Sequence, residues 1–245
     1  MEQSTFSNKT IVRWREDVEN PINQPESYGP PLADAELRLD ALSAQVAANL
    51  NTLRHPETDW MPSLIGPDGK SLLDVLVVGA GQGGIAIAGS LMRERVTNIL
   101  VIDKEPRDRE GIWNSHGRMP VIRSPKHYPG PDMGIPNLTY EAWHKATYGE
   151  ESWEAIVLVP IDNWIKYLGW VRQTLKIPVQ NNTELLKIQP AANGMKVTLK
   201  GLAKTEVLYV RRIVLATGHD GTGEWWLPDY LASLPTNLCA KASDP

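Results

Sequence analysis

Two short apolar runs on either side of a glycine-rich segment form the clearest pattern in the chain. Residues 74–78 are nearly all apolar and rich in valine, as is typical of a strand buried on both faces of a parallel sheet. Residues 85–95 follow a helical pattern, and residues 99–103 form a second apolar run. This order predicts a βαβ unit with a right-handed crossover.

The chain on either side of this unit predicts two parts. Residues 1–70 are expected to form an arm and a helix, because prolines interrupt the first thirty residues whereas residues 34–55 carry apolar side chains at helical spacing. Asp34 is the candidate helix cap. Residues 71–245 are expected to form the main domain, with an irregular, proline-rich insertion at residues 106–160.

The pattern after the insertion predicts a helix and then strands only. Residues 162–175 carry a helical apolar stripe, and Asn193-Gly194 is a strong hairpin signal. The strand-like segments lie at residues 177–180, 183–188, 195–199, 205–210 and 212–216, the last of which is expected to be buried. The expected fold is therefore a three-layer α/β Rossmann-like domain, with a parallel sheet plus a β-meander and an N-terminal helical arm.

Composition and charge exclude several classes of protein. The net charge of −4 and the pI of about 5.8 provide no positive field for nucleic acid. The single cysteine, Cys239, cannot form an intramolecular disulfide or complete a thiolate zinc site. No apolar run approaches the ~18 residues of a membrane-spanning helix, and the polar N-terminus does not resemble a signal peptide. We therefore expect a cytoplasmic protein with no nucleic-acid or membrane partner and no metal.

The glycine-rich segment carries the strongest chemical signal. Gly79, Gly81 and Gly84 stand where a strand turns sharply into a helix, so that a pyrophosphate can approach the helix N-terminus closely. Asp103 ends the second strand nineteen residues after Gly84, the spacing at which a carboxylate reaches ribose hydroxyls. Together they predict a dinucleotide site. The alternative for Asp103 is a solvated residue at a strand end.

Three further features favour FAD over a nicotinamide cofactor. Residues 111–113, Gly-Ile-Trp, follow the second strand, where flavoproteins pass a glycine-rich segment over the flavin. A β-meander precedes the last strand, and residues 216–218, Ala-Thr-Gly, close that strand beside the first glycine loop. Their order and spacing together predict FAD.

Five segments of the chain resemble the flavin-containing monooxygenase-like branch of the FAD/NAD(P)-binding oxidoreductases. They read VVGAGQGG, LVIDKEP, GIWN, RSPKHYPGPDMGIPNLTYEAW and IVLATGHDGTG, and the resemblance extends over residues 72–235. It implies one domain for FAD and a second, inserted domain for NADPH, which together use O₂ to oxygenate a small molecule. It assigns no catalytic residue. The cofactor-binding residues that follow from motif and resemblance are Gly79, Gly81, Gln82, Gly83, Gly84, Asp103, Lys104, Trp113, Arg123, Ser124, Leu185, Ala216, Thr217 and Gly218.

The sequence departs from this family at three points. Glu110 replaces the first glycine of the more frequent GGxW, and Arg123 stands where some members carry asparagine. No second GxGxxG follows Gly223, whereas family members are much longer. We therefore expect an FAD-dependent, monooxygenase-like oxidoreductase represented by its amino-terminal half, with a small-molecule substrate. The alternative is a flavoprotein fold that serves a non-redox reaction, as an isomerase or cyclase, or that works with a separate reductase or a second copy.

Other candidate groups carry weaker signals. The histidines at positions 116, 127, 144 and 219 lack the spacing of metal ligands, and His219 is expected to make a local hydrogen bond. Trp143, Trp153, Trp164 and Trp170 are expected in the core, with a substrate channel as the alternative. For Trp225-Trp226, an exposed interaction patch is one interpretation.

Overall fold

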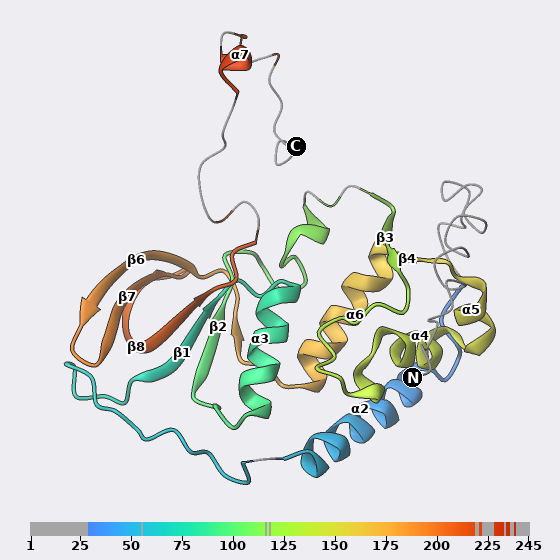
Figure 1. Ribbon diagram of the computed structural model, residues 1–245, viewed down its shortest axis with the longest axis horizontal. Coiled ribbons are helices and arrows are strands. Elements are labelled where there is room, and N and C mark those ends of the chain that lie inside the picture. The colour runs from blue at the N-terminus through green and yellow to red at the C-terminus, as the bar shows by residue number, and fades with distance from the viewer. Residues whose placement is uncertain are drawn as a thin grey trace, which may run out of the picture.

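The computed structural model describes residues 29–54, 56–115, 117, 119–218, 221, 228–232, 234–235 and 238. The predictions for residues 1–28, His116, His219, Trp225-Trp226 and Cys239 lie outside these residues. A six-stranded sheet has the strand order β5-β2-β1-β8-β7-β6, and helices α3 and α6 lie beside its parallel part (Figure 1). No helix in the described part of the chain is long and apolar enough to cross a membrane.

The parallel part of the sheet contains the predicted βαβ unit. Strand β1 (Leu73–Val78) pairs in parallel with β2 (Ile99–Ile102) on one side and with β8 (Thr205–Leu215) on the other. Strand β5 (Val179–Gln180) extends the sheet beyond β2. Helix α3 (Gln82–Arg93) connects β1 to β2, as the pattern predicted.

Strand β8 connects the parallel part of the sheet to the antiparallel meander, because it pairs with strands of both parts. Strands β6 (Glu184–Ala191), β7 (Gly194–Lys200) and the first half of β8 pair antiparallel, and the β6–β7 turn lies at the predicted hairpin. Val210 pairs with β7 on one side and with β1 on the other, so β8 changes partner there. The prediction of two separate strands at residues 205–210 and 212–216 was therefore wrong.

The second face of the sheet is closed by the meander, which completes the predicted three layers. Leu76 and Ile102 from the parallel strands form a fully buried cluster with Val197, Leu199 and Val210 from the meander. The expectation of a buried final strand at residues 212–216 was wrong, because none of these residues is fully buried and Leu215 is 58% exposed.

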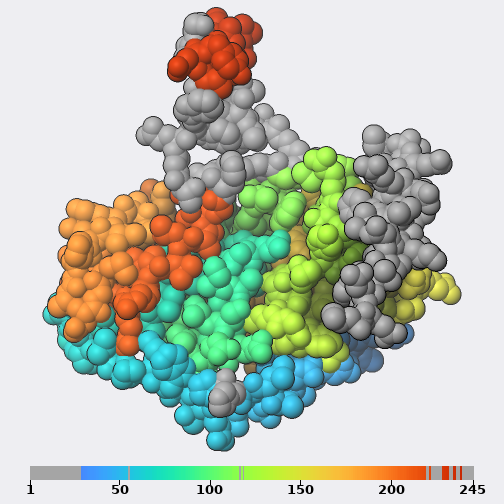
Figure 2. All heavy atoms as spheres, viewed as in Figure 1, coloured from blue at the N-terminus to red at the C-terminus, as the bar shows by residue number. Residues whose placement is uncertain are grey.

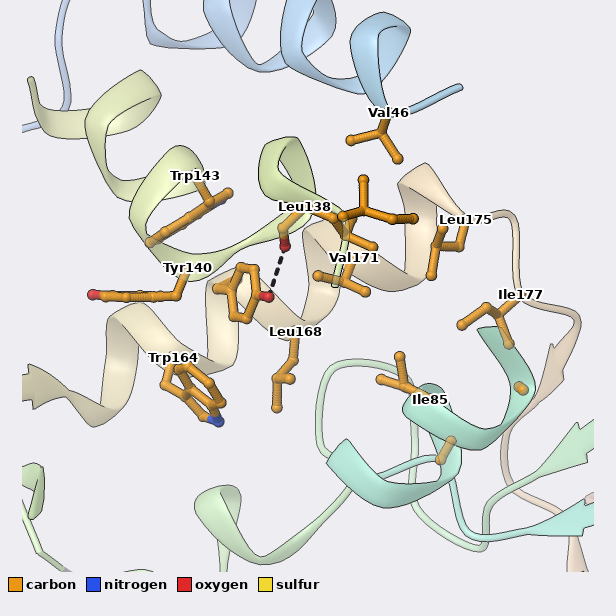
Figure 3. Close-up of a cluster of buried hydrophobic side chains, with 14 of the residues drawn as sticks. Val46, Ile85, Leu138, Tyr140, Trp143, Trp164, Leu168, Val171, Leu175 and Ile177 are labelled. Carbon is orange, nitrogen blue, oxygen red and sulfur yellow. Dashed lines mark hydrogen bonds between the residues drawn. The ribbon is translucent and has the colours of Figure 1, made fainter. Parts of the chain in front are cut away.

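The main core lies on the other face of the sheet, where α6 (Ile161–Thr174) packs against α3. Figure 3 shows Trp164, Leu168 and Val171 of α6 in one cluster with side chains of α4 (Tyr140–Tyr148) and α3. Its dashed line is the bond from the buried Tyr167 hydroxyl to the Leu138 carbonyl oxygen, 2.8 Å long. Trp143, Trp153 and Trp164 are buried here, and Trp170 is partly buried against the same cluster, so the core interpretation is confirmed for the first three.

Helix α2 (Ala35–Thr52) lies along the edge of this core (Figure 2). Val46 is fully buried in the main cluster, and Ser43 accepts a hydrogen bond of 3.1 Å from the Trp170 indole. Asp34 precedes the helix without capping it, because its carboxylate instead accepts a hydrogen bond from Arg38. The prediction of a side-chain cap was wrong.

The insertion is more regular than its prolines suggest. Thr139 caps α4, accepting a hydrogen bond of 3.2 Å from the Ala142 N–H, and Tyr140, Trp143 and Thr147 form the buried face of that helix. The expectation of an irregular segment was therefore wrong for its second half. The remaining elements are η2 (Ile112–Asn114), β3 (Val121–Pro125), η3 (Pro136–Leu138), α4 (Tyr140–Tyr148), α5 (Glu150–Ala155), β4 (Leu158–Pro160) and, near the C-terminus, α7 (Asp229–Ala232).

Candidate dinucleotide site

The predicted glycine loop connects β1 to α3 and requires glycine for two reasons at its first position. Gly79 has φ of +104°, a conformation that side chains with a Cβ rarely adopt. A Cβ at Gly79 would also overlap the carbonyl oxygen of Ala216, just beyond β8. The first glycine therefore allows the ends of β1 and β8 to approach each other, and Ala216 lies beside the loop as predicted.

The other glycines of the motif have different surroundings. A Cβ at Gly84 would overlap the Gly79 carbonyl oxygen, so this glycine lets α3 pack closely on the end of β1. Gly81 is the N-cap residue of α3, whereas Gly83 is exposed and has open space around its Cβ position. The Gln82 side chain accepts a hydrogen bond of 3.1 Å from the Trp164 indole, which ties the start of α3 to α6.

Asp103 lies at the end of β2 with its carboxylate directed at the glycine loop. One carboxylate oxygen accepts the Ala80 N–H at 2.7 Å, and the other accepts the Glu105 N–H at 2.8 Å. The residue is only 8% exposed, so the alternative of a solvated strand end is wrong. Asp103 thus fixes the loop, and its oxygens keep unused lone pairs that can accept further hydrogen bonds.

The segment after β2 returns to the glycine loop and forms a second wall of the site. Gly111 has φ of +77°, and its Cα lies 3.1 Å from the Cβ position of Gly81. Between this segment, the start of α3 and α6 lies a cavity of about 40 Å³, lined among others by Gly81, Trp113 and Arg172. At 10–15 Å³ for each water, it has room for about three water-sized groups. The whole of a dinucleotide does not fit inside it.

Sequence reasoning missed an ion pair in this wall. Arg172 of α6 pairs with Glu110, and both side chains are almost fully buried. Asn181 completes the group, since it accepts a hydrogen bond of 2.9 Å from Arg172 and donates one of 2.5 Å to Glu110. The departure from GGxW at position 110 was the only signal, and it did not indicate a partner that is 62 residues away.

The remaining predicted residues lie on several different elements. Leu185 begins the meander, and Lys104 follows Asp103 with an exposed side chain. Arg123 and Ser124 are exposed on β3, paired with β4 and apart from the glycine loop in sequence and sheet. Thr217 and Gly218 follow β8. The roles of all these residues in cofactor binding stay predictions.

Two observations bear on whether a dinucleotide suits these residues. Gly81 supplies no side-chain cap to α3, so the first N–H groups of the helix are without this usual acceptor, and such a helix N-terminus is the kind of site that holds a pyrophosphate. The Thr217 hydroxyl, just after β8, is buried and has no hydrogen-bond partner in the described part of the chain, so a bound ligand could supply that partner. The residues present therefore fit a bound dinucleotide. No cluster of potential metal ligands occurs among the described residues.

Comparisons with known proteins agree with this geometry. The family model described as FAD-NAD(P)-binding matches residues 76–220, more than half of the chain. An FAD-dependent urate hydroxylase of Xanthomonas campestris pv. campestris is 39% identical over 211 residues, which make up 85% of this chain and 44% of that relative. The chain thus spans less than half the length of this curated relative.

A solved structure has the same fold. The FAD-bound cadaverine monooxygenase of the desferrioxamine biosynthetic pathway from Erwinia amylovora matches with a TM-score of 0.54 and 15% identity, over 66% of this chain and 38% of that one. The predicted Rossmann-like fold is therefore confirmed, and so is FAD as the predicted cofactor type of the family. Because the family model matches more than half of the chain and the glycine loop has the geometry described above, the chain belongs to the FAD-NAD(P)-binding family.

Proposed function

We propose that this chain is the FAD-binding part of a flavin-dependent hydroxylase. The observation that carries the proposal is the meeting of three elements at the C-terminal ends of β1 and β2. The glycine loop, the Asp103 carboxylate and the Gly111 segment are in direct contact there. Ligands of open α/β sheets bind at this end of the strands. The Xanthomonas relative supports the hydroxylase assignment by its similarity over most of this chain.

Each element has a defined task in this proposal. The N-terminus of α3, with Gly81 at its N-cap, offers backbone N–H groups to the pyrophosphate. The unused lone pairs of Asp103 accept hydrogen bonds from the ribose while its two backbone bonds hold the loop. Because the cavity is small, it would enclose only part of the cofactor, and the buried Thr217 hydroxyl would be available as a further hydrogen-bonding group at the end of β8.

When bound, FAD would supply the two electrons with which one oxygen atom of O₂ is transferred to the substrate and the other is reduced to water, and the protein would supply position and electrostatics. For the substrate we propose urate or a related nitrogen heterocycle. This proposal is supported by the relative that is 39% identical over 211 residues, which is a urate hydroxylase.

A single-turnover experiment tests the hydroxylase proposal. The protein is loaded with FAD, reduced with dithionite without oxygen, and then mixed with urate in aerated buffer. We expect urate to be consumed in proportion to the reduced flavin, and xanthine in place of urate serves as the matched substrate control. Reoxidation of the flavin with no loss of urate would contradict urate as the substrate. If the protein takes up no FAD at all, the whole proposal is wrong.

A further inference from the structure

A closed group of three polar side chains belongs to the second wall of the candidate site. Arg172 donates through Nη1 to Glu110 and through Nη2 to Asn181, and Asn181 donates through Nδ2 to the same Glu110 oxygen. The Glu110 and Arg172 side chains are only 10% and 12% exposed. Taking two charges out of water is costly, so such a pair is weak evidence for a gain in stability. Its position suggests another role.

These three side chains join three separate parts of the chain. Glu110 belongs to the segment between β2 and η2, Arg172 to the last turn of α6, and Asn181 to the loop after β5. The Asn181 amide also donates to the Glu105 carbonyl oxygen at 3.1 Å. Glu105 in turn donates its N–H to Asp103. The group is thus connected at one end to the residue that fixes the glycine loop.

The other end of the group is connected to the glycine loop through Gly111, the residue after Glu110. Glu110 is followed by Gly111, whose backbone is in contact with Gly81, and both Glu110 and Arg172 line the cavity between the two walls. The spacing of the walls therefore depends on where Glu110 is held. The resembling family more often has glycine at this position, which has no side chain to make such bonds.

We propose that Glu110, Arg172 and Asn181 form a clamp that holds the Gly111 segment at the spacing that retains FAD. The clamp residues are positioning residues: they act through the backbone of the wall. This inference rests on the proposed FAD site. Removing the charge of Glu110 leaves the buried Arg172 guanidinium without its ionic partner, which should loosen the hold on the Gly111 segment. We expect Glu110→Gln to release FAD about tenfold faster, which corresponds to about 1.4 kcal/mol.

A second buried ion pair provides a matched control. Asp74 near the start of β1 lies 3.0 Å from Arg211 of β8, and their side chains are 6% and 13% exposed. Asp74 lies at the opposite end of β1 from Gly79. Asp74→Asn therefore removes one charge from a pair of similar burial away from the site. It should lower the midpoint of thermal unfolding and leave the rate of FAD release unchanged.

The experiment follows the recovery of flavin fluorescence after FAD-loaded protein is diluted, together with the unfolding midpoint of FAD-free protein. Glu110→Gln should raise the release rate and Asp74→Asn should not. Arg172→Lys keeps the charge and loses the bond to Asn181, so it should give a smaller rise, and it replaces Glu110→Gln if that variant does not fold.

The possible outcomes distinguish the clamp hypothesis from the proposed FAD site. If both charge variants lower the unfolding midpoint and release FAD at the rate of the unsubstituted protein, the clamp is wrong and the FAD site stands. If the unsubstituted protein binds no FAD, the proposed function and the clamp are both overturned. Faster release from Glu110→Gln alone supports both.

Discussion

Alanine substitution at two neighbouring glycines, Gly83 and Gly84, should change the stability of the protein in opposite directions. Both lie in the first turn of α3, and each gains one methyl group. The Cβ position at Gly83 has no atom within 4 Å, whereas the one at Gly84 overlaps the Gly79 carbonyl oxygen and lies 2.9 Å from the carbonyl carbon. Both contacts of Gly84 are with backbone, which cannot rotate away.

The magnitudes follow from two competing effects. Alanine is favoured over glycine in a helix by about 0.5–1 kcal/mol, so Gly83→Ala should stabilise the protein by up to that amount. At Gly84 the same gain is opposed by forcing α3 away from β1, and overpacking of this kind costs about 1–3 kcal/mol or more. We expect a net loss of about 2 kcal/mol. At about 2–4 °C for each kcal/mol, Gly84→Ala should lower the unfolding midpoint by about 4–8 °C.

Urea denaturation and thermal unfolding of the FAD-free proteins measure both effects. Gly83→Ala controls for helix propensity, because it makes the same chemical change one residue away. If the two variants shift stability equally, or if Gly84→Ala is harmless, then α3 does not pack on Gly79 as described, and the account of the third glycine is wrong.

Three further predictions concern buried polar groups. Burial, together with the positive charge of Lys126, lowers the pKa of His144 to about 4, below its ordinary value of 6.5. Because the unfolded chain takes up this proton first, the free energy of unfolding should fall as the pH drops from 6.5 toward 4, by roughly 3 kcal/mol in all. His144→Gln should flatten that part of the profile and the exposed His127→Gln should not, as equilibrium denaturation at each pH would show. Asp103→Ala leaves the buried Ala80 N–H without its acceptor and should cost the FAD-free protein about 1–3 kcal/mol, a loss whose absence in urea titrations would refute the loop-fixing role. Trp164→Phe removes the bond to Gln82 and should cost about 0.5–1.5 kcal/mol; thermal unfolding identical to that of the unsubstituted protein would contradict this.

The βαβ unit could be predicted because its signals are local. The valine-rich run, the glycine spacing and the acidic residue directly after the second apolar run can each be recognised from a short stretch of sequence. The helix α4 was missed although Tyr140, Trp143 and Thr147 have helical spacing, because the nearby prolines suggested an irregular segment throughout. Thr139, which caps that helix, is the local signal that could have identified it.

Features that depend on distant partners could not be predicted. Nothing in the sequence indicates that Glu110 pairs with Arg172 and not with one of the nearby arginines, since the choice depends on how α6 packs. The continuity of β8 likewise follows from Val210 having partners on both sides, which no local pattern encodes. Asp103 illustrates both cases, because its position in the motif was predictable and its two backbone bonds were not.

Equilibrium titration with FAD, followed by flavin fluorescence, shows whether the glycine loop is a dinucleotide site. We expect saturation at one FAD per chain and displacement by ADP, because the glycine loop and Asp103 would hold the ADP half of the cofactor. We also expect Gly81→Val, confirmed to be folded by circular dichroism, to show no saturable binding, since its side chain would occupy the narrow space next to Gly111. Failure of the unsubstituted protein to bind FAD, or binding by Gly81→Val with unchanged affinity, would contradict the assignment of this loop as the dinucleotide site.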